Sequence, residues 1–436
     1  MSFTNYIDVP DYAALIEKIN AYSNLQQEYG AEGVAQVLAT AEKSLQEAIE
    51  KLKALPIDQE LSKKEPNDYA SITALRPAQG GKFQRSIDAE SYRKRLAGAF
   101  VGRIAGCILG AATENWEIQK MLELAERNDD DFPLTDYWTY VPDPYAKRYI
   151  VSPREDYTKP KMKEAPADDD IIYTILGMLA MEEHGLNLTT KEIGETWVKY
   201  LTMGYSAEEA ALNNLKAGID SSLAGETDNP YCEWIGADIR CDPWAYVMPG
   251  QPEKAAALAY QDAYLSHRRQ GIYGAMYFAA AISAAFVLDD PVEALHIALN
   301  EIPAECQLAK VVKWALDISP QVKDYKDARA LIDENFPGMG KVHTLNNACL
   351  TIFGITIGKT DYSKVISQTM AMGLDNDCTA ATAGSIVGAV VGIDNISEHW
   401  YKPFNNKIRS YLNGPDYFEI DDVIERFIKL TADRLN

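Results

Sequence analysis

Residues 95–114 read RLAGAFVGRIAGCILGAATE, with glycine at every fourth position: Gly98, Gly102, Gly106 and Gly110. Residues four apart lie on one face of an α-helix, and each glycine inside a helix costs about 1 kcal/mol relative to alanine. A helix that keeps four glycines in one row therefore needs another backbone to approach that face closely. We predict a helix over residues 95–112 with such a contact.

A second helix rich in small residues is predicted over residues 379–391, where Gly384 and Gly388 are also four apart. Apolar residues recur with helical spacing in most other segments. The further predicted helices cover residues 12–22, 34–52, 171–183, 190–200, 252–266, 273–287, 362–372 and 421–435. Segments that alternate between apolar and polar residues are scarce, so we predict an all-α fold, a compact orthogonal multi-helix bundle.

The chain is predicted to have two parts. Residues 1–90 are expected to form an N-terminal helical extension and linker, because periodicity is lost over residues 55–90, which contain three prolines and a Gly-Gly pair. Residues 91–436 are expected to form the main domain. Whether the extension caps this domain, covers a cleft or mediates dimerisation stays open. Residues 130–160 are expected to form an aromatic-rich loop.

Composition limits the possible partners. The formal charge of -22 disfavours binding to nucleic acids or anionic membranes, and 47% hydrophobic residues indicate a globular chain. We find no signal peptide, no apolar run long enough to span a bilayer and no CxxC pair among the six cysteines. A cytoplasmic protein is therefore expected. The oligomeric state is left open.

Asp168, Asp169 and Asp170 precede an apolar helix that is predicted to start at Ile171. One aspartate is enough to cap a helix, and three adjacent carboxylates repel one another unless a cation or the helix N-terminus compensates their charge. The two interpretations are a capping cluster and a metal site.

Residues 373–379, GLDNDCT, form a second acidic motif before a helix. Asp375 and Asp377 would face apart on a regular helix, but both can reach one cation from a turn. Oxygen ligands favour Mg²⁺, Mn²⁺ or Ca²⁺ over zinc. Capping is the alternative here as well. Glu114, just beyond the glycine-rich helix, is either an acid–base group, a metal ligand or an ordinary surface residue.

Together and in this order, these three segments resemble the ADP-ribosylglycohydrolase family, over residues 91–436. Its members have a glycine-rich helix followed by Glu, a Thr-Asp-Asp motif that opens a helix, and a Gly-Gly-Asp-Thr-Asp-Thr motif before a helix of alanine and glycine. The best register aligns Asp168 with the threonine of the Thr-Asp-Asp motif, and a shift that aligns Ala167 with it stays open.

The resemblance implies a hydrolase that cleaves an N- or O-glycosidic bond to ADP-ribose, protein-linked or in a small derivative, and uses one or two Mg²⁺ or Mn²⁺ ions. The implied metal ligands are Asp168, Asp169, Asp170, Asp375, Asp377 and Cys378. The implied catalytic residues are Glu114, Asp169 and Asp377. The implied substrate contacts are Gly236, Ala237, Arg240, His267 and Tyr273.

Several alternatives accompany these implications. Cys378 replaces a threonine ligand of the family, and a thiol is a poor ligand for Mg²⁺. Arg240 suits either a substrate phosphate or a buried ion pair, and His267 either a substrate contact or a core position. The tyrosines of residues 130–160 suit either adenine stacking or a packed loop. The chain itself is alternatively a related glycoside or nucleoside hydrolase, or a non-catalytic ADP-ribose-binding or structural relative.

Overall fold

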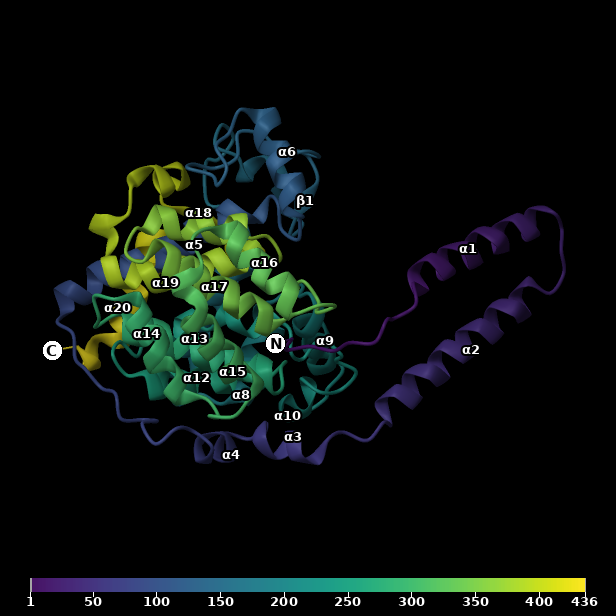
Figure 1. Ribbon diagram of the computed structural model, residues 1–436, viewed down its shortest axis with the longest axis horizontal. Coiled ribbons are helices and arrows are strands. Elements are labelled where there is room, and N and C mark those ends of the chain that lie inside the picture. Colours follow the sequence, from purple (N-terminus) through teal and green to yellow (C-terminus); the bar gives the residue numbers. More distant parts are fainter. Residues whose placement is uncertain (1, 436) are drawn as a thin grey trace. The chain divides into compact units, whose positions relative to one another are not determined.

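The computed structural model describes residues 2–435 (Figure 1). The chain forms two units, residues 5–63 and residues 2–4 together with 64–435. The larger unit is built almost entirely of helices, which confirms the predicted all-α class. Its α-helices are α4 (Tyr69–Ala74), α5 (Ala89–Ala111), α6 (Ile118–Asn128), α7 (Asp169–His184), α8 (Thr190–Tyr200), α9 (Ser206–Lys216), α10 (Ser221–Ala224), α11 (Asp242–Tyr246), α12 (Pro252–Ala263), α13 (Gln270–Ala285), α14 (Pro291–Ala298), α15 (Gln307–Ile318), α16 (Tyr325–Asn335), α17 (Thr344–Gly358), α18 (Tyr362–Ala371), α19 (Asn376–Val391) and α20 (Ile420–Thr431).

Two small antiparallel sheets accompany the helices. One pairs β1 (Lys147–Arg148) with β2 (Ser152–Pro153), and the other pairs β3 (Lys407–Arg409) with β4 (Tyr417–Glu419). The first sheet lies within the segment predicted as an aromatic-rich loop. Within residues 2–435, no helix combines the length and the apolar character that crossing a membrane requires.

Helices α5 and α19 run antiparallel with their backbones in contact (Figure 1). A Cβ atom on Gly102 would lie 2.5 Å from the carbonyl oxygen of Gly384, and a Cβ on Gly106 would fall under 3.0 Å from the carbonyl of Ala380. Gly110 faces the first turn of α19 in the same way. The glycine row therefore exists because α19 leaves no room for side chains, and it brings the end of α5 to the start of α19.

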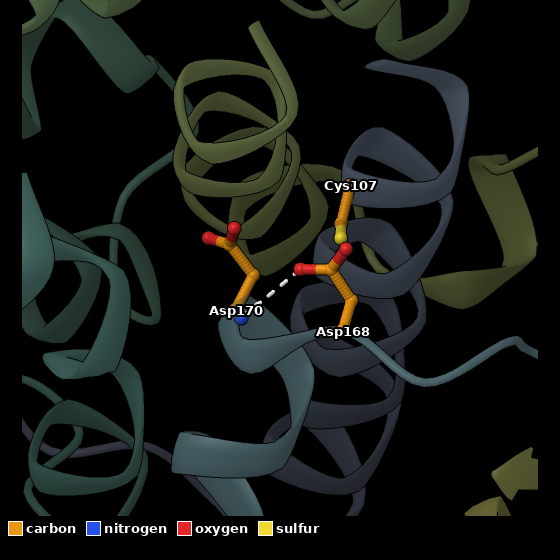
Figure 2. A group of neighbouring side chains, drawn as sticks. All are labelled: Cys107, Asp168 and Asp170. Atoms are coloured by element: carbon orange, nitrogen blue, oxygen red, sulfur yellow. Dashed lines mark hydrogen bonds between the residues drawn. The ribbon is translucent and has the colours of Figure 1, made fainter. Parts of the chain in front are cut away.

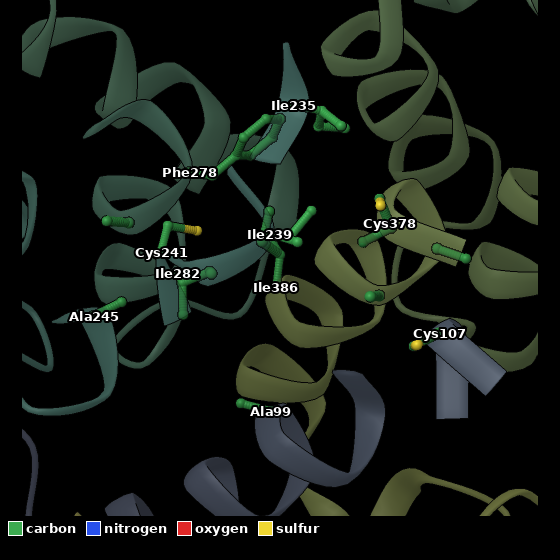
Figure 3. Close-up of a cluster of buried hydrophobic side chains, with 14 of the residues drawn as sticks. Ala99, Cys107, Ile235, Ile239, Cys241, Ala245, Phe278, Ile282, Cys378 and Ile386 are labelled. Carbon is green, nitrogen blue, oxygen red and sulfur yellow. The ribbon is translucent and has the colours of Figure 1, made fainter. Parts of the chain in front are cut away.

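The core continues from this helix pair to the centre of the unit. Figure 3 shows Ala99 and Cys107 of α5 and Ile386 of α19 in one apolar cluster with Ile239 and Phe278. These side chains are almost completely buried. Burial of this kind contributes about 25 cal/mol per Å² of apolar surface, so the elements that carry the acidic motifs are fixed by the core of the protein.

Residues 64–90 are part of the larger unit and are tied to its helices at several points. Glu65 is buried, and its Oε1 atom accepts a hydrogen bond from the backbone N–H of Gln307 at 2.8 Å. Arg76 forms an ion pair with buried Glu301 at 3.1 Å. The segment also contains helix α4 and the end of α3 (Gln59–Lys64), where the sequence showed no helical periodicity.

The smaller unit contains two helices, α1 (Tyr12–Glu28) and α2 (Val34–Lys53), and the start of α3. Asp11 caps α1, with its Oδ1 atom accepting from the N–H of Ala14 at 2.9 Å. Neither α1 nor α2 has a buried residue. The predicted helices over residues 12–22 and 34–52 fall within these two elements.

Helix α17 supports the second acidic motif from behind. His343 caps its N-terminus, with Nδ1 accepting from the backbone N–H of Leu345 at 3.2 Å. One turn later, the side-chain oxygen of Asn347 accepts from the N–H of Asp375 at 3.3 Å, and its nitrogen donates to the carbonyl of Lys341 at 2.8 Å. The start of α17 thus holds the backbone of the motif in place.

The backbone contact between α5 and α19 is tested by replacing Gly106 with alanine. The added methyl group would meet the backbone of Ala380 and Ala381, which cannot rotate away, so Gly106→Ala should lower the free energy of unfolding by about 1–3 kcal/mol. Gly340→Ala is the control, because no atom lies within 4 Å of a Cβ added there. Equal urea midpoints for both variants would contradict this packing.

The cap of α17 predicts a dependence of stability on pH. Burial, assisted by the charge of Arg269, lowers the pKa of His343 from 6.5 to about 4. The folded protein therefore favours neutral His343, and this stability is present above pH 6.5 and lost as the pH falls from 6.5 towards 4. For a shift of this size, the loss is roughly 3 kcal/mol.

The matched variant is His343→Asn, because asparagine caps a helix without titrating. Between pH 6.5 and 4 the wild-type protein should lose more stability in urea titrations than His343→Asn does. Parallel pH profiles for the two proteins would contradict the assignment of this loss to His343.

Candidate functional site

The three acidic segments singled out in the sequence converge on one cavity of about 500 Å³. Glu114 follows the end of α5, Asp169 opens α7, and Asp375 and Asp377 lie at the start of α19. The residues lining the cavity are Glu114, Lys147, Arg148, Tyr149, Asp169, Tyr205, Ser206, Glu208, Trp234, Ile235, Gly236, Ile239, Val342, Asp375, Asp377 and Cys378. The antiparallel packing of α5 and α19 brings the first and last of the three segments together.

The motif before α19 is built on an unusual backbone. Gly373 and Leu374 both have positive φ angles, 72° and 59°, and the carbonyl of Leu374 accepts from the N–H of Asn115 at 2.9 Å. This left-handed entry directs the carboxyl groups of both Asp375 and Asp377 into the cavity wall. Only glycine adopts such angles without strain, so the strained Leu374 marks a conformation that the surroundings impose.

The carboxyl groups of this motif are buried without enough partners. The Oδ1 atoms of Asp375 and Asp377 are buried and have no hydrogen-bond donor. Burial, and then the charge of Glu114, raises the pKa of Asp375 to about 7, and the same causes raise the pKa of Asp377 well above its usual value. Both groups would gain from a positive charge placed beside them.

The motif before α7 divides its three aspartates among different partners. Asp168 caps the helix, accepting from the N–H of Asp170 at 3.2 Å, as Figure 2 shows. Fully buried Asp170 pairs with the equally buried Arg103 at 2.9 Å. Asp169 lines the cavity and accepts from the hydroxyl of Tyr149 at 2.6 Å. Capping therefore explains Asp168, while Asp169 is the member that reaches the cavity.

Arg148 connects all three segments. Its guanidinium group donates to Glu114 at 2.9 Å, to Asp168 at 3.0 Å and to Asp377 at 3.1 Å. The side chain is 17% exposed, so solvent screens these contacts only weakly. Nothing in the sequence singled out this residue, because it lies in the segment 130–160, far from every acidic motif along the chain.

Cys378 lies beside the carboxylates as a thiol. Its Sγ atom donates to Asp170 Oδ2 at 3.2 Å. Burial, with the neighbouring charge of Asp170 and Asp375, raises the pKa of Cys378 well above its usual value, so the proton stays on the sulfur. A protonated thiol is neither a strong nucleophile nor a good ligand for a hard cation.

The residues present fit a divalent cation of the Mg²⁺ type. Cations of this class prefer carboxylate oxygens, and the cavity wall offers carboxylates from Asp169, Asp375 and Asp377. The two unpartnered Oδ1 atoms are the strongest indication, since buried polar atoms in folded proteins are nearly always satisfied. Asp375, Asp377 and Cys378 lie close enough together to hold one ion. Cys107, Asp168 and Asp170 form another close group, but Arg103 already neutralises Asp170.

Some of the expected substrate contacts lie at the cavity and others do not. Gly236 lines the cavity, and Ala237 is buried behind it. Arg240 does not reach the cavity, because its guanidinium pairs with Glu208 and with Asp262. A buried ion pair, one of the two alternatives for this arginine, therefore accounts for its contacts.

His267 and Tyr273 lie away from the cavity as well. His267 is fully buried, with Nδ1 2.8 Å from the hydroxyl of Ser266, and burial lowers its pKa well below the usual value. The hydroxyl of Tyr273 donates to the carbonyl of Pro66 at 2.5 Å. Their polar groups are thus turned towards the protein itself.

Several cavity residues were not expected from the sequence. Glu208 and Tyr205 belong to a segment without a recognisable motif, and Trp234 lies two residues before the expected contact Gly236; the fold brings all three to the wall. Tyr149 was one of several tyrosines in residues 130–160, and its ring stacks on Tyr411 with centroids 5.3 Å apart. In the sequence, the high density of aromatic residues in that segment was the feature that could have pointed to Tyr149 as a cavity residue.

Comparisons with known proteins identify the family and a related fold. The structure resembles a solved structure described as an ADP-ribosylglycohydrolase-related protein complex, with a TM-score of 0.55 and 16% identity over 79% of this chain and 100% of that one. This likeness concerns the fold alone. No curated protein matches the chain by sequence. A model of the family described as ADP-ribosylglycohydrolase matches residues 88–434, most of the chain. The chain therefore belongs to the ADP-ribosylglycohydrolase family.

Proposed function

We propose that the protein is a metal-dependent glycohydrolase that cleaves an N- or O-glycosidic bond to ADP-ribose, in a modified protein or in a small derivative. The observation that carries this proposal is the convergence of three acidic segments on one cavity, where the buried Oδ1 atoms of Asp375 and Asp377 lack partners. A structural protein gains nothing from carboxylates buried in this way, since their desolvation costs free energy.

Asp375 and Asp377 are the residues that would hold the ion, Mg²⁺ or Mn²⁺, and Asp169 lines the same cavity. When bound, such an ion supplies positive charge that anchors hydroxyl groups and lowers the pKa of water. Asp168 and Asp170 would support the site from behind, since Arg148 and Arg103 occupy them. The thiol of Cys378 would orient Asp170 and leave ligation to the carboxylates.

Glu114 is the proposed general base. It lines the cavity, and its side chain is 30% exposed, so the carboxylate can reach both solvent and substrate. Asn115 donates to its Oε1 at 3.0 Å and Arg148 to its Oε2 at 2.9 Å, which orients the group. Glycosidic bonds break with oxocarbenium character, and the neighbouring carboxylates of Asp169 and Asp377 would stabilise the positive charge that develops on the sugar.

The remaining cavity wall suits a nucleotide-sized ligand. A volume of about 500 Å³ lies in the range of small-molecule sites. Tyr205 and Trp234 add aromatic surface, and the carboxylate of Glu208 packs against the Cα side of Gly236. We propose that these residues contact the ADP-ribose part of the substrate, while the leaving group extends towards solvent.

Metal binding is tested by thermal unfolding with excess Mn²⁺ or Mg²⁺ and with EDTA. An ion at 100 times its Kd stabilises the fold by about 2.7 kcal/mol, so the Tm of the wild-type protein should rise. Asp377→Asn should lose most of this rise, because it removes a charged ligand. Asp433→Asn, on the exposed C-terminal turn, should retain it. An unchanged Tm of the wild type under both ions would contradict metal binding.

Catalysis is tested by following ADP-ribose release from arginine-, serine- and O-acetyl-linked ADP-ribose. Glu114→Gln keeps the shape of the side chain and removes the base, so kcat should fall by about 10²–10⁴-fold on any substrate that is cleaved. If the wild-type protein releases no ADP-ribose from any of the three linkages but binds ADP-ribose, this would favour a binding protein with the same fold.

A further inference from the structure

The guanidinium group of Arg148 occupies the point where the three acidic segments meet. It contacts one carboxylate from each of them, those of Glu114, Asp168 and Asp377, at 2.9–3.1 Å. Bridging carboxylates from separate segments is what a bound cation does in an acidic site. An arginine side chain remains charged at every physiological pH, so this positive charge is a permanent part of the chain.

The position of Arg148 is built into the local backbone. It ends β1, and the hairpin to β2 turns through Tyr149 and Ile150, whose φ angles are 46° and 69°. Two successive residues other than glycine in this region indicate a conformation that the surroundings enforce. Beyond the turn, the hydroxyl of Ser152 accepts from the N–H of Ala167 at 2.9 Å, which ties the hairpin to the Asp168–Asp170 motif.

Arg148 divides the carboxylate oxygens into two groups. Asp168 is fully engaged, with Oδ2 on Arg148 and Oδ1 on the N–H of Asp170. Asp377 gives only its Oδ2 atom to Arg148, while its Oδ1 atom and the Oδ1 atom of Asp375 stay without donors. The unsatisfied oxygens therefore lie on the α19 side, whereas on the α7 side Arg148 and Arg103 neutralise Asp168 and Asp170, and Asp169 accepts from the hydroxyl of Tyr149.

We infer that Arg148 serves as an internal cation that fills one of two cation positions in this acidic site, so that a single divalent ion binds, on Asp375 and Asp377. The inference rests on the proposed metal dependence and refines it from one or two ions to one. It also gives Arg148 a positioning role, because the guanidinium orients Glu114 and Asp377 whether or not an ion is present.

The test counts bound Mn²⁺ on the purified full-length chain by equilibrium dialysis, with electron paramagnetic resonance of the free ion as the readout. The wild-type protein should bind one Mn²⁺ per chain at saturation. Arg148→Met, which keeps an apolar stem and removes the charge, should bind two. Arg148→Lys should still bind one, and so should Lys147→Met, which removes a positive charge from the same cavity wall without a carboxylate contact.

A second readout separates this role from simple packing. Without metal, Arg148→Met should melt at a lower temperature than the wild type, and saturating Mn²⁺ should raise its Tm more than it raises the Tm of the wild type. A loss of stability that Mn²⁺ does not restore would overturn the role as a cation. Where Arg148→Met does not fold, two bound Mn²⁺ ions per wild-type chain still overturn the inference, and so does a second bound ion in Arg148→Lys, which keeps the positive charge.

The outcomes distinguish a failure of the role inferred for Arg148 from a failure of the proposed metal dependence. Two Mn²⁺ ions in the wild type, or one in both the wild type and Arg148→Met, overturn the role of Arg148 and leave metal dependence in place. No Mn²⁺ in any of the variants overturns the proposed metal dependence and the inference with it. One ion in the wild type and two in Arg148→Met support both.

Discussion

The site depends on one contact, the direct approach of the α5 backbone to the α19 backbone. Even the Cβ atom of an alanine at Gly98, Gly102 or Gly106 would meet backbone atoms of the opposing helix segment, which have no freedom to move aside. Because the helices run antiparallel, this contact fixes the end of α5 against the start of α19. Glu114 and the pair Asp375 and Asp377 thus come from opposite ends of the chain and reach one cavity through packing.

The electrostatics of the site follow from its burial. Aspartates at the starts of α7 and α19 are removed from water, and the guanidinium groups of Arg103 and Arg148 pair with three of them, Asp168, Asp170 and Asp377. Burial, and then the charge of Glu114, raises the pKa of Asp375 to about 7. Such clusters occur at functional sites more often than elsewhere, and the family match over residues 88–434 agrees with that interpretation.

Much of the fold was predictable because its signals are local. The glycine row, the acidic motifs and the predicted helices each lie within one short segment, and the structure confirms the all-α class. The partner of the glycine row was not predictable, since spacing reveals a close contact without identifying the other helix. Arg148 escaped prediction for a similar reason: its three partners lie 20 to 229 positions away in sequence. Arg240 and His267 carry functional side chains, but their burial turns them towards other protein groups.

The hairpin that carries Arg148 has a consequence for the protein when ions are scarce. A side chain of the protein is present at the site at a constant effective concentration, which its covalent tether sets and which no change in the medium can dilute. A dissolved ion, in contrast, comes and goes with its supply. The arrangement of Glu114, Asp168 and Asp377 around the guanidinium therefore does not depend on the supply of divalent ions.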